Sequence, residues 1–164
     1  MALSANHRVL VGLSRNTFLL AAASLFADIS TEMLYPILPI FLAQNLSVSG
    51  GLIGLLEGIA GATQNITQGF SGWLSDRLRQ RKRIALVGYA LAAIAKPLIG
   101  ISTVWQGVLG ARFLDRLGSG LRSAPRDALV GESAEEKYRG RAFGLEGAGD
   151  NAGAFLGPLI AVAL

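Results

Sequence analysis

Long apolar stretches recur along this sequence, and they restrict its possible folds more than any other feature. A helix that crosses the hydrocarbon core of a bilayer, about 30 Å thick, needs roughly 20 mostly apolar residues. Five stretches approach this requirement, at about residues 18–42, 50–74, 84–102, 104–130 and 142–164. We therefore expect an all-α, polytopic membrane protein in which these five helices form one partial bundle over residues 1–164.

The composition supports this fold and argues against several classes of function. Of the 164 residues, 51% are apolar and 16% are charged, whereas about a quarter of the residues of a soluble domain are charged. The chain has no cysteine and one histidine, His7, near the N-terminus, so we expect no metal site and no other cofactor. No nucleophile, metal-binding or phosphate-loop motif occurs, which argues against an enzyme.

Basic residues are concentrated on alternate connections between the apolar stretches. The segment GWLSDRLRQRKR at 72–83 carries five cations, and the connection at 131–141 carries three cations beside three glutamates. Under the positive-inside rule, both connections and the N-terminus lie in the cytoplasm. We therefore expect a multi-pass protein of a bacterial inner membrane, in contact with the lipid bilayer. The pI of about 10 does not indicate a nucleic-acid partner, because no aromatic stacking platform accompanies the charge.

Ionisable residues lie inside the apolar stretches, where one charge costs at least about 2.5 kcal/mol on insertion scales. On the first, second, fourth and fifth stretches the polar residues recur at helical spacing and mark one stripe per helix. We expect these four helices to line a shared polar space, which is the layout of a solute path, and the third helix to cover them from the lipid side. The candidate path residues are Asp28, Glu32, Glu57, Gln64, Arg112, Asp115, Arg116 and Asp150.

Some of these charges have a purely structural interpretation. Asp115 with Arg116, and Glu146 with Arg122, are candidates for interhelical ion pairs that only fix the packing. Lys96 is the single charge of the third stretch, and we expect its side chain to snorkel toward the outer interface.

Glycine and proline residues predict close helix contacts and bends. Gly149, Gly153 and Gly157 lie four residues apart on one ridge, where another backbone can approach closely. Pro158 follows them and predicts a bend in the fifth helix. We expect further bends at the prolines of the first helix, in its outer half, and of the third helix. These residues are Pro36, Pro39 and Pro97.

Three segments resemble motifs of the major facilitator superfamily, and within it of the drug/proton antiporter-like exporters. RFLDRLGSG at 112–120 is similar to the family's helix 4 motif, and GAFLGP at 153–158 resembles its helix 5 motif. The segment at 72–83 looks like the loop between helices 2 and 3, although Arg79 stands where the family usually has a glycine. The residues that match this loop, which we name the gate segment, are Gly72, Asp76, Arg77, Arg81 and Lys82.

The resemblance implies a mechanism and roles for these residues. The gate segment would form a cytoplasmic charge network that holds the outward-facing state closed. The chain would be the N-terminal part of a twelve-helix transporter, truncated at its C-terminus and completed by a C-terminal half or by partner helices. Protons would drive the export of a small organic substrate by alternating access. Asp28, Glu32 or Glu57 would carry the proton, because a low-dielectric cavity favours the neutral carboxyl group, and Arg112 would lie beside the carrier.

Two other functions stay open at this point. A facilitator-fold importer of a sugar or an organic anion is favoured by the cations of the fourth helix. A non-transporting membrane scaffold or partner subunit is also consistent with the fold, because fold does not fix function.

Overall fold

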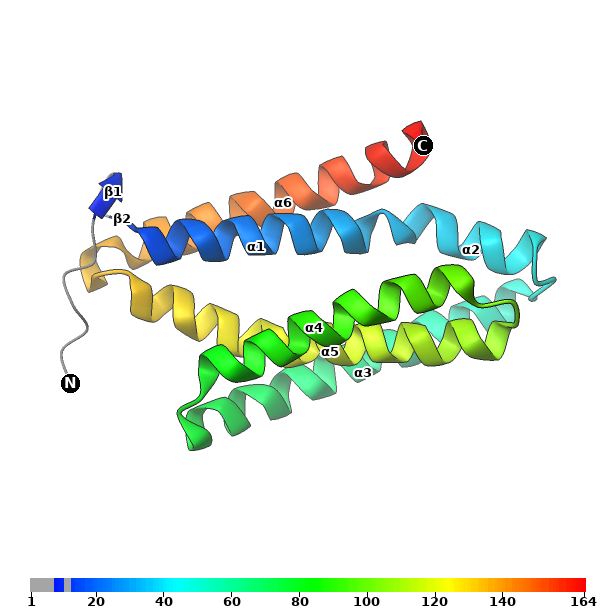
Figure 1. The fold of residues 1–164 in the computed structure, drawn as a ribbon, viewed down its shortest axis with the longest axis horizontal. Helices are drawn as coiled ribbons and strands as arrows, with labels where there is room; N and C mark the ends of the chain where they lie inside the picture. Colours follow the sequence, from blue (N-terminus) through cyan, green and yellow to red (C-terminus); the bar gives the residue numbers. More distant parts are fainter. Residues whose placement is uncertain (1–7, 11–12) are drawn as a thin grey trace. The chain divides into compact units, whose positions relative to one another are not determined.

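The computed structural model describes residues 8–10 and 13–164, and His7 therefore lies outside the described residues. Figure 1 shows that almost all of the described chain is helical, which confirms the expected all-α class. A short antiparallel pair of strands precedes the first helix. In chain order, the elements are β1 (Arg8–Leu10), β2 (Leu13–Ser14), α1 (Arg15–Glu32), α2 (Leu34–Gln44), α3 (Gly50–Leu78), α4 (Arg81–Ile101), α5 (Trp105–Ser133), the 3₁₀ turn η1 (Glu136–Tyr138) and α6 (Arg139–Ala163).

The helices belong to two compact units, which we describe separately. Unit 1 contains residues 1–37 and 127–164, and unit 2 contains residues 38–126. Unit 1 therefore holds α1, the end of α5, and α6. Unit 2 holds most of α2, all of α3 and α4, and most of α5.

The first apolar stretch forms two helices, with the break at Met33. We expected a kink at the prolines themselves, but α1 ends at Glu32, four residues before Pro36. The reason is the proline ring, which clashes with the carbonyl four residues earlier and offers no N–H to bond it. Pro36 itself lies in the first turn of α2, where its missing N–H leaves no intrahelical bond unmade.

Several helices begin or end at other residues than expected. α3 continues past residue 74 to Leu78, and α6 begins at Arg139, three residues before the expected start. The gate segment is therefore helical and not a loop, and only Arg79 and Gln80 separate α3 from α4. The turn is made by Arg79, which ends α3 in the left-handed conformation with φ 53° and ψ 31°.

In unit 1, α1 and α6 lie side by side along the glycine ridge of α6 (Figure 1). A Cβ atom added to Gly153 would lie 2.9 Å from the Cβ of Asp28, and one added to Gly157 would lie 2.6 Å from the Cβ of Glu32. At Gly149 the same atom would lie 3.0 Å from the carbonyl oxygen of Ala21. The predicted close approach of a second backbone is therefore confirmed, and the partner is α1.

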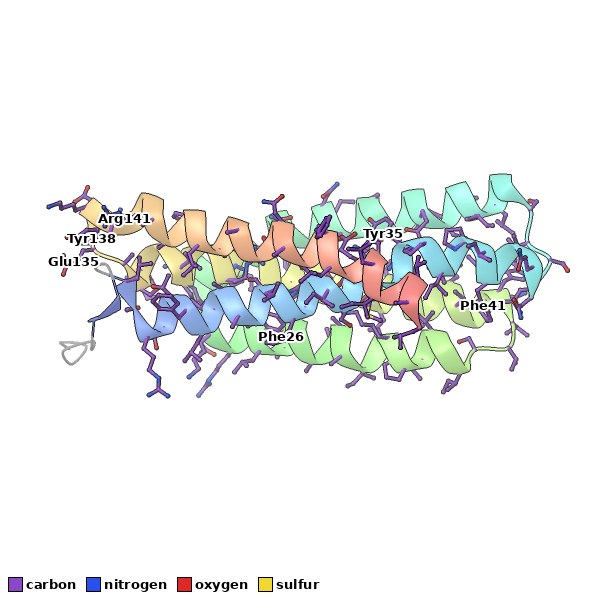
Figure 2. The ribbon with its side chains drawn as sticks, turned by 90° about the horizontal axis from the view of Figure 1, so that it is seen from above. Phe26, Tyr35, Phe41, Glu135, Tyr138 and Arg141 are labelled. Carbon is purple, nitrogen blue, oxygen red and sulfur yellow. The ribbon has the colours of Figure 1, made fainter. Side chains whose placement is uncertain are left out.

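The end of unit 1 that we predict to be cytoplasmic is stabilised by a small hydrophobic core and by a cation–π contact. Leu13, Val130, Ala134 and Ala142 are buried together. Figure 2 shows Tyr138 and Arg141 close together at the start of α6, where the Arg141 guanidinium lies 5.3 Å from the ring centre of Tyr138. This cation–π contact connects η1 to the first turn of α6.

In unit 2, glycines bring α3 and α4 against α5. A Cβ atom added to Gly118 of α5 would lie 2.7 Å from the carbonyl oxygen of Gly88 in α4, and the reverse contact is 2.6 Å. On the other side of α5, Gly120 packs against the backbone of Gln64, and the Ser71 hydroxyl donates to the Gly120 carbonyl at 3.0 Å. Small residues thus let three backbones approach closely, as in other membrane helix bundles.

The distribution of polarity is the inverse of that in a soluble domain. Ile66 and Phe26 are 73% and 69% exposed, whereas Arg112 and Asp115 are 2% and 0% exposed. Two helical segments, Arg15–Gln44 and Arg81–Ile101, are long and apolar enough to cross a membrane by composition alone. Among the described residues, the other three long helices, α3, α5 and α6, do not meet this test.

Candidate functional site

The candidate site is built on α5, a helix of 29 residues. Several of the polar side chains of this helix are buried. They recur every three or four residues, which places them on one face of the helix. In unit 2 this face meets α3 on one side and α4 on the other. The buried polar residues of the face are Arg112, Asp115, Arg116, Ser119, Arg122 and Arg126.

Arg112 forms a two-point ion pair with Glu57 of α3. Its Nε donates to Oε1 of Glu57 at 3.0 Å, and its Nη2 donates to Oε2 at 2.9 Å. Two N–H groups of the guanidinium thus face the two oxygens of the carboxylate, which is the strongest geometry for a pair of arginine and glutamate. The Glu57 side chain is 30% exposed, while that of Arg112 is 2% exposed. The structure therefore brings together two residues that are 55 positions apart in the sequence.

Asp115 lies behind this pair and contacts three cations. Its Oδ2 lies 3.4 Å from Nη1 of Arg112 and 3.7 Å from Nε of Arg116. The expected pair of Asp115 with Arg116 is therefore present, but it is formed within α5 and is not interhelical. The completely buried carboxyl group of Asp115 thus lies among two guanidinium groups and one ammonium group.

The third of these cations is Lys96, whose position corrects the sequence-based expectation. Its Nζ lies 3.9 Å from Oδ1 of Asp115, and its side chain is only 16% exposed. Lys96 does not snorkel toward an interface, because a buried carboxylate on the neighbouring helix offers better compensation than partial hydration. The third apolar stretch, α4, thus contributes a charge to the site and is not merely a cover.

Gln64 of α3 also contacts α5. Its Oε1 accepts a hydrogen bond from Nη1 of Arg116 at 2.9 Å. Glu57 and Gln64, seven residues apart, therefore hold two arginines of α5 that are four residues apart. Asn65, the residue next to Gln64, is exposed.

The other candidate path residues belong to unit 1. Asp28 and Glu32 lie on the face of α1 that packs on the glycine ridge of α6, and both are partly buried. Asp150 is also partly buried, on α6, next to Gly149 of that ridge. These three residues share a unit with one another and not with Glu57 and Arg112. One polar space shared by both sets stays a prediction, as does the pair of Glu146 with Arg122.

The gate segment contains an ion pair between the end of α3 and the start of α4. Nη2 of Arg81 donates to Oδ1 of Asp76 at 2.5 Å, and the side chains are 27% and 63% exposed. Asp76 thus lies beside the N-terminus of α4, where partial positive charge accumulates. Arg77 lies over the ring of Trp73 at 5.3 Å, and Gly72 lets α3 approach Ala124 of α5. Lys82 is exposed.

Sequence reasoning missed two members of this site. Lys96 was assigned to the surface because helical spacing does not tell which helix a lone charge faces. Tyr89 was not considered, and the Arg122 guanidinium lies 4.8 Å from the centre of its ring. The only available signal for Tyr89 was its spacing of seven residues from Lys96. Within the described residues, His, Cys, Asp and Glu side chains form no cluster suited to a metal ion.

The sequence was compared with known families and proteins. The profile of the Major Facilitator Superfamily matches residues 20–164. An uncharacterized MFS-type transporter of Methanocaldococcus jannaschii is 40% identical over 152 residues, which is 92% of this chain and 37% of that protein. An uncharacterized protein of Mycobacterium tuberculosis is 30% identical over 118 residues, which is 72% of this chain and 29% of that protein.

A more distant relative has a named function. The quinolone resistance protein NorA of Staphylococcus aureus is 25% identical over 126 residues, which is 77% of this chain and 32% of that protein. The chain thus spans about a third of the length of these relatives. The profile match over most of the chain and the 40% identity establish its family. This chain is a membrane protein of the Major Facilitator Superfamily, a family of transporters.

Proposed function

We propose that this chain supplies the N-terminal part of a secondary transporter that exports small organic compounds in exchange for protons. The observation that carries the proposal is the pair of Glu57 and Arg112, in which a partly exposed carboxylate is held by a buried arginine. Such a carboxylate has access to water and also controls a contact between two helices. The name of the relative NorA, a quinolone resistance protein, supports an organic drug as the kind of substrate.

Glu57 is the proton carrier in this proposal. When Glu57 is ionised, it accepts two charge-assisted hydrogen bonds from Arg112 and holds α3 against α5. When Glu57 takes up a proton, one of its oxygens becomes a donor and the pair with Arg112 weakens. Arg112 still contacts Asp115, 3.4 Å away. Protonation is thereby converted into a change in helix contact, which is the step that proton coupling requires.

The remaining parts of the transporter follow from the same scheme. Asp28 and Glu32 are the other candidate carriers, at the contact of α1 with α6. Two helical bundles rock about a site near the bilayer midplane, and the second bundle comes from a C-terminal half or from partner helices. The gate segment closes the transport path on its cytoplasmic side. The protein lies in an inner membrane with its N-terminus in the cytoplasm. The coupled species are protons and a small-molecule substrate, within a lipid bilayer.

Transport in inverted membrane vesicles that contain the full-length protein tests this function. An imposed pH gradient should drive the uptake of norfloxacin, a quinolone, and dissipation of the gradient should stop it. Glu57→Gln should abolish the response to the gradient while the protein still inserts normally. If Glu57→Gln still responds to the pH gradient, loss of this response in Asp28→Asn or in Glu32→Gln identifies the carrier. Full gradient-driven transport by all three variants would refute the assignment of the carrier.

A second function is favoured by one observation. The buried face of α5 carries four arginines, Arg112, Arg116, Arg122 and Arg126, and buried arginines are suited to carboxylate or phosphate groups. An importer of an organic anion would use them to bind its substrate. Inhibition of norfloxacin transport by a lipophilic cation such as ethidium supports the exporter, and accumulation of an organic anion in right-side-out vesicles supports the importer.

A further inference from the structure

The turn between α3 and α4 places an arginine where glycine would be the unstrained residue. Arg79 has a φ of 53°, and its side chain is exposed. A residue with a Cβ atom is strained in this left-handed conformation, whereas glycine is not. Because the backbone of the turn favours glycine, the reason for an arginine at this position lies in its charged side chain.

Arg79 belongs to a cluster of exposed cations, which we name the basic turn. Residues 72–83 hold five cations and one carboxylate, that of Asp76, which pairs with Arg81 at 2.5 Å. The other basic connection, at 131–141, holds three cations and three glutamates. The first connection therefore carries a large excess of positive charge, which attracts anions, and the second does not. The basic turn consists of the four remaining cations of the first connection, Arg77, Arg79, Lys82 and Arg83, which are all exposed.

An exposed apolar stripe of α3 leads to the basic turn. Ile66, Phe70 and Trp73 are exposed and lie four and three residues apart, which places them on one face of the helix. The ring centres of Phe70 and Trp73 are 5.7 Å apart, and the Arg77 guanidinium lies 5.3 Å from the ring centre of Trp73. A tryptophan beside an arginine at the end of an apolar stripe is typical of the level of the lipid headgroups.

A second exposed stripe, on α4, ends at the same turn. Arg83, Val87 and Ile94 are exposed and lie four and seven residues apart, again on one face. Nη1 of Arg83 donates to Oε1 of Gln80 at 3.4 Å. Figure 1 shows α3 and α4 meeting at this turn, where Arg79 and Gln80 separate the two helices. The exposed stripes of two helices thus end in arginines at one short turn.

We propose that the basic turn binds the phosphate headgroup of an anionic phospholipid, whose acyl chains lie along the apolar stripe of α3. The cations complement the charge of the headgroup, and the stripe complements the acyl chains. A free phosphate ion would meet the cations but leave the stripe uncovered, so the two features together favour a lipid. This inference goes beyond the proposed function, because lipid binding does not require transport.

Quenching of tryptophan fluorescence by brominated lipids measures this binding at the site itself. The full-length protein is reconstituted into phosphatidylcholine vesicles with increasing shares of dibrominated phosphatidylglycerol, and the series is repeated with dibrominated phosphatidylcholine. The part of the quenching that Trp73→Phe removes reports the lipid beside Trp73. In the wild type, phosphatidylglycerol should bind there at least about five-fold more strongly than phosphatidylcholine. Raising the salt concentration should reduce this preference, since salt screens exposed charges.

Arg79→Gly separates lipid binding from stability. It removes one cation near the membrane surface, so the preference for phosphatidylglycerol should fall about five-fold. The turn should nevertheless become more stable, because glycine adopts the positive φ without strain. Arg83→Gln should reduce the preference to a similar extent, and Arg79→Lys should retain most of it. Arg139→Gln is the matched control, because it removes an exposed arginine from the connection at 131–141, and it should leave the preference unchanged.

The preference of the wild type, its loss in Arg79→Gly and Arg83→Gln, and its retention in Arg139→Gln support the inference. Equal quenching by the two brominated lipids would overturn it, as would an unchanged preference in both arginine variants. A Trp73→Phe variant that removes no quenching would overturn it as well. Competition by inorganic phosphate at matched ionic strength would identify a free anion as the occupant and also overturn it. A protein that selects phosphatidylglycerol but does not respond to a pH gradient refutes the proposed function alone.

Discussion

Glu57 and Arg112 face each other from two helices with both donors of the guanidinium edge matched to both oxygens of the carboxylate, at 3.0 and 2.9 Å. The pair joins α3 to α5 at a level where Arg112 is almost completely buried. A buried charge that loses its partner is strongly destabilising, whereas the loss of both charges together costs much less. This asymmetry gives the first prediction.

Arg112→Met should lower the free energy of unfolding by about 3 kcal/mol, because it leaves the carboxylates of Glu57 and Asp115 with less compensation. The double variant Glu57→Gln/Arg112→Met should recover part of this loss, since it removes a carboxylate together with the arginine. Thermal unfolding of the full-length protein in detergent measures both. A double variant less stable than Arg112→Met would show that the two side chains act independently.

Gly157→Ala should weaken the contact of α6 with α1 by about 1–3 kcal/mol, because the added methyl would meet the Cβ of Glu32 at 2.6 Å. Gly144→Ala is the matched control in the same helix, since a Cβ atom there has nothing within 4 Å. The control should be neutral or slightly stabilising, as alanine is the better helix former. Equal effects of the two substitutions on thermal stability would contradict the observed packing.

Arg79→Gly should stabilise the turn between α3 and α4 by about 0.5–1 kcal/mol, because Arg79 has a positive φ of 53° that glycine adopts without strain. Arg79→Ala removes the same charge without this conformational freedom, so the difference between the two variants isolates the backbone effect. Their relative stability is read from thermal unfolding. A more stable alanine variant would argue against the left-handed conformation at this position.

Asp76→Asn should change the stability by less than about 1 kcal/mol, because the pair of Asp76 with Arg81 is largely exposed to solvent. If the gate segment closes the cytoplasmic side, the same variant should nevertheless slow norfloxacin transport several-fold. The exchange Asp76→Arg/Arg81→Asp, which reverses the pair, should restore part of the rate. Wild-type transport rates in Asp76→Asn at low and high salt would argue against a gating role.

The sequence by itself determined the class of the fold and the residues that deserve a test. Apolar stretches of about 20 residues need a bilayer, and polar residues at helical spacing must share a face, so both follow from local geometry. The glycine ridge of α6 was predictable for the same reason, and the structure confirms it. The sequence predicted that prolines would bend the first helix, but it did not predict a break at Met33. A proline acts on the carbonyl of the preceding turn, so the helix ends before the proline itself.

The tertiary structure decided which faces meet. Helical spacing places Lys96 on one side of α4 but says nothing about the helix on that side, so the sequence could not foresee its contact with Asp115. The same limit applies to Glu57 and Arg112, which are 55 residues apart and meet only because Gly120 and Ser71 bring α3 close to α5. A charge inside a membrane protein must be compensated, but only the packing of the helices selects the partner.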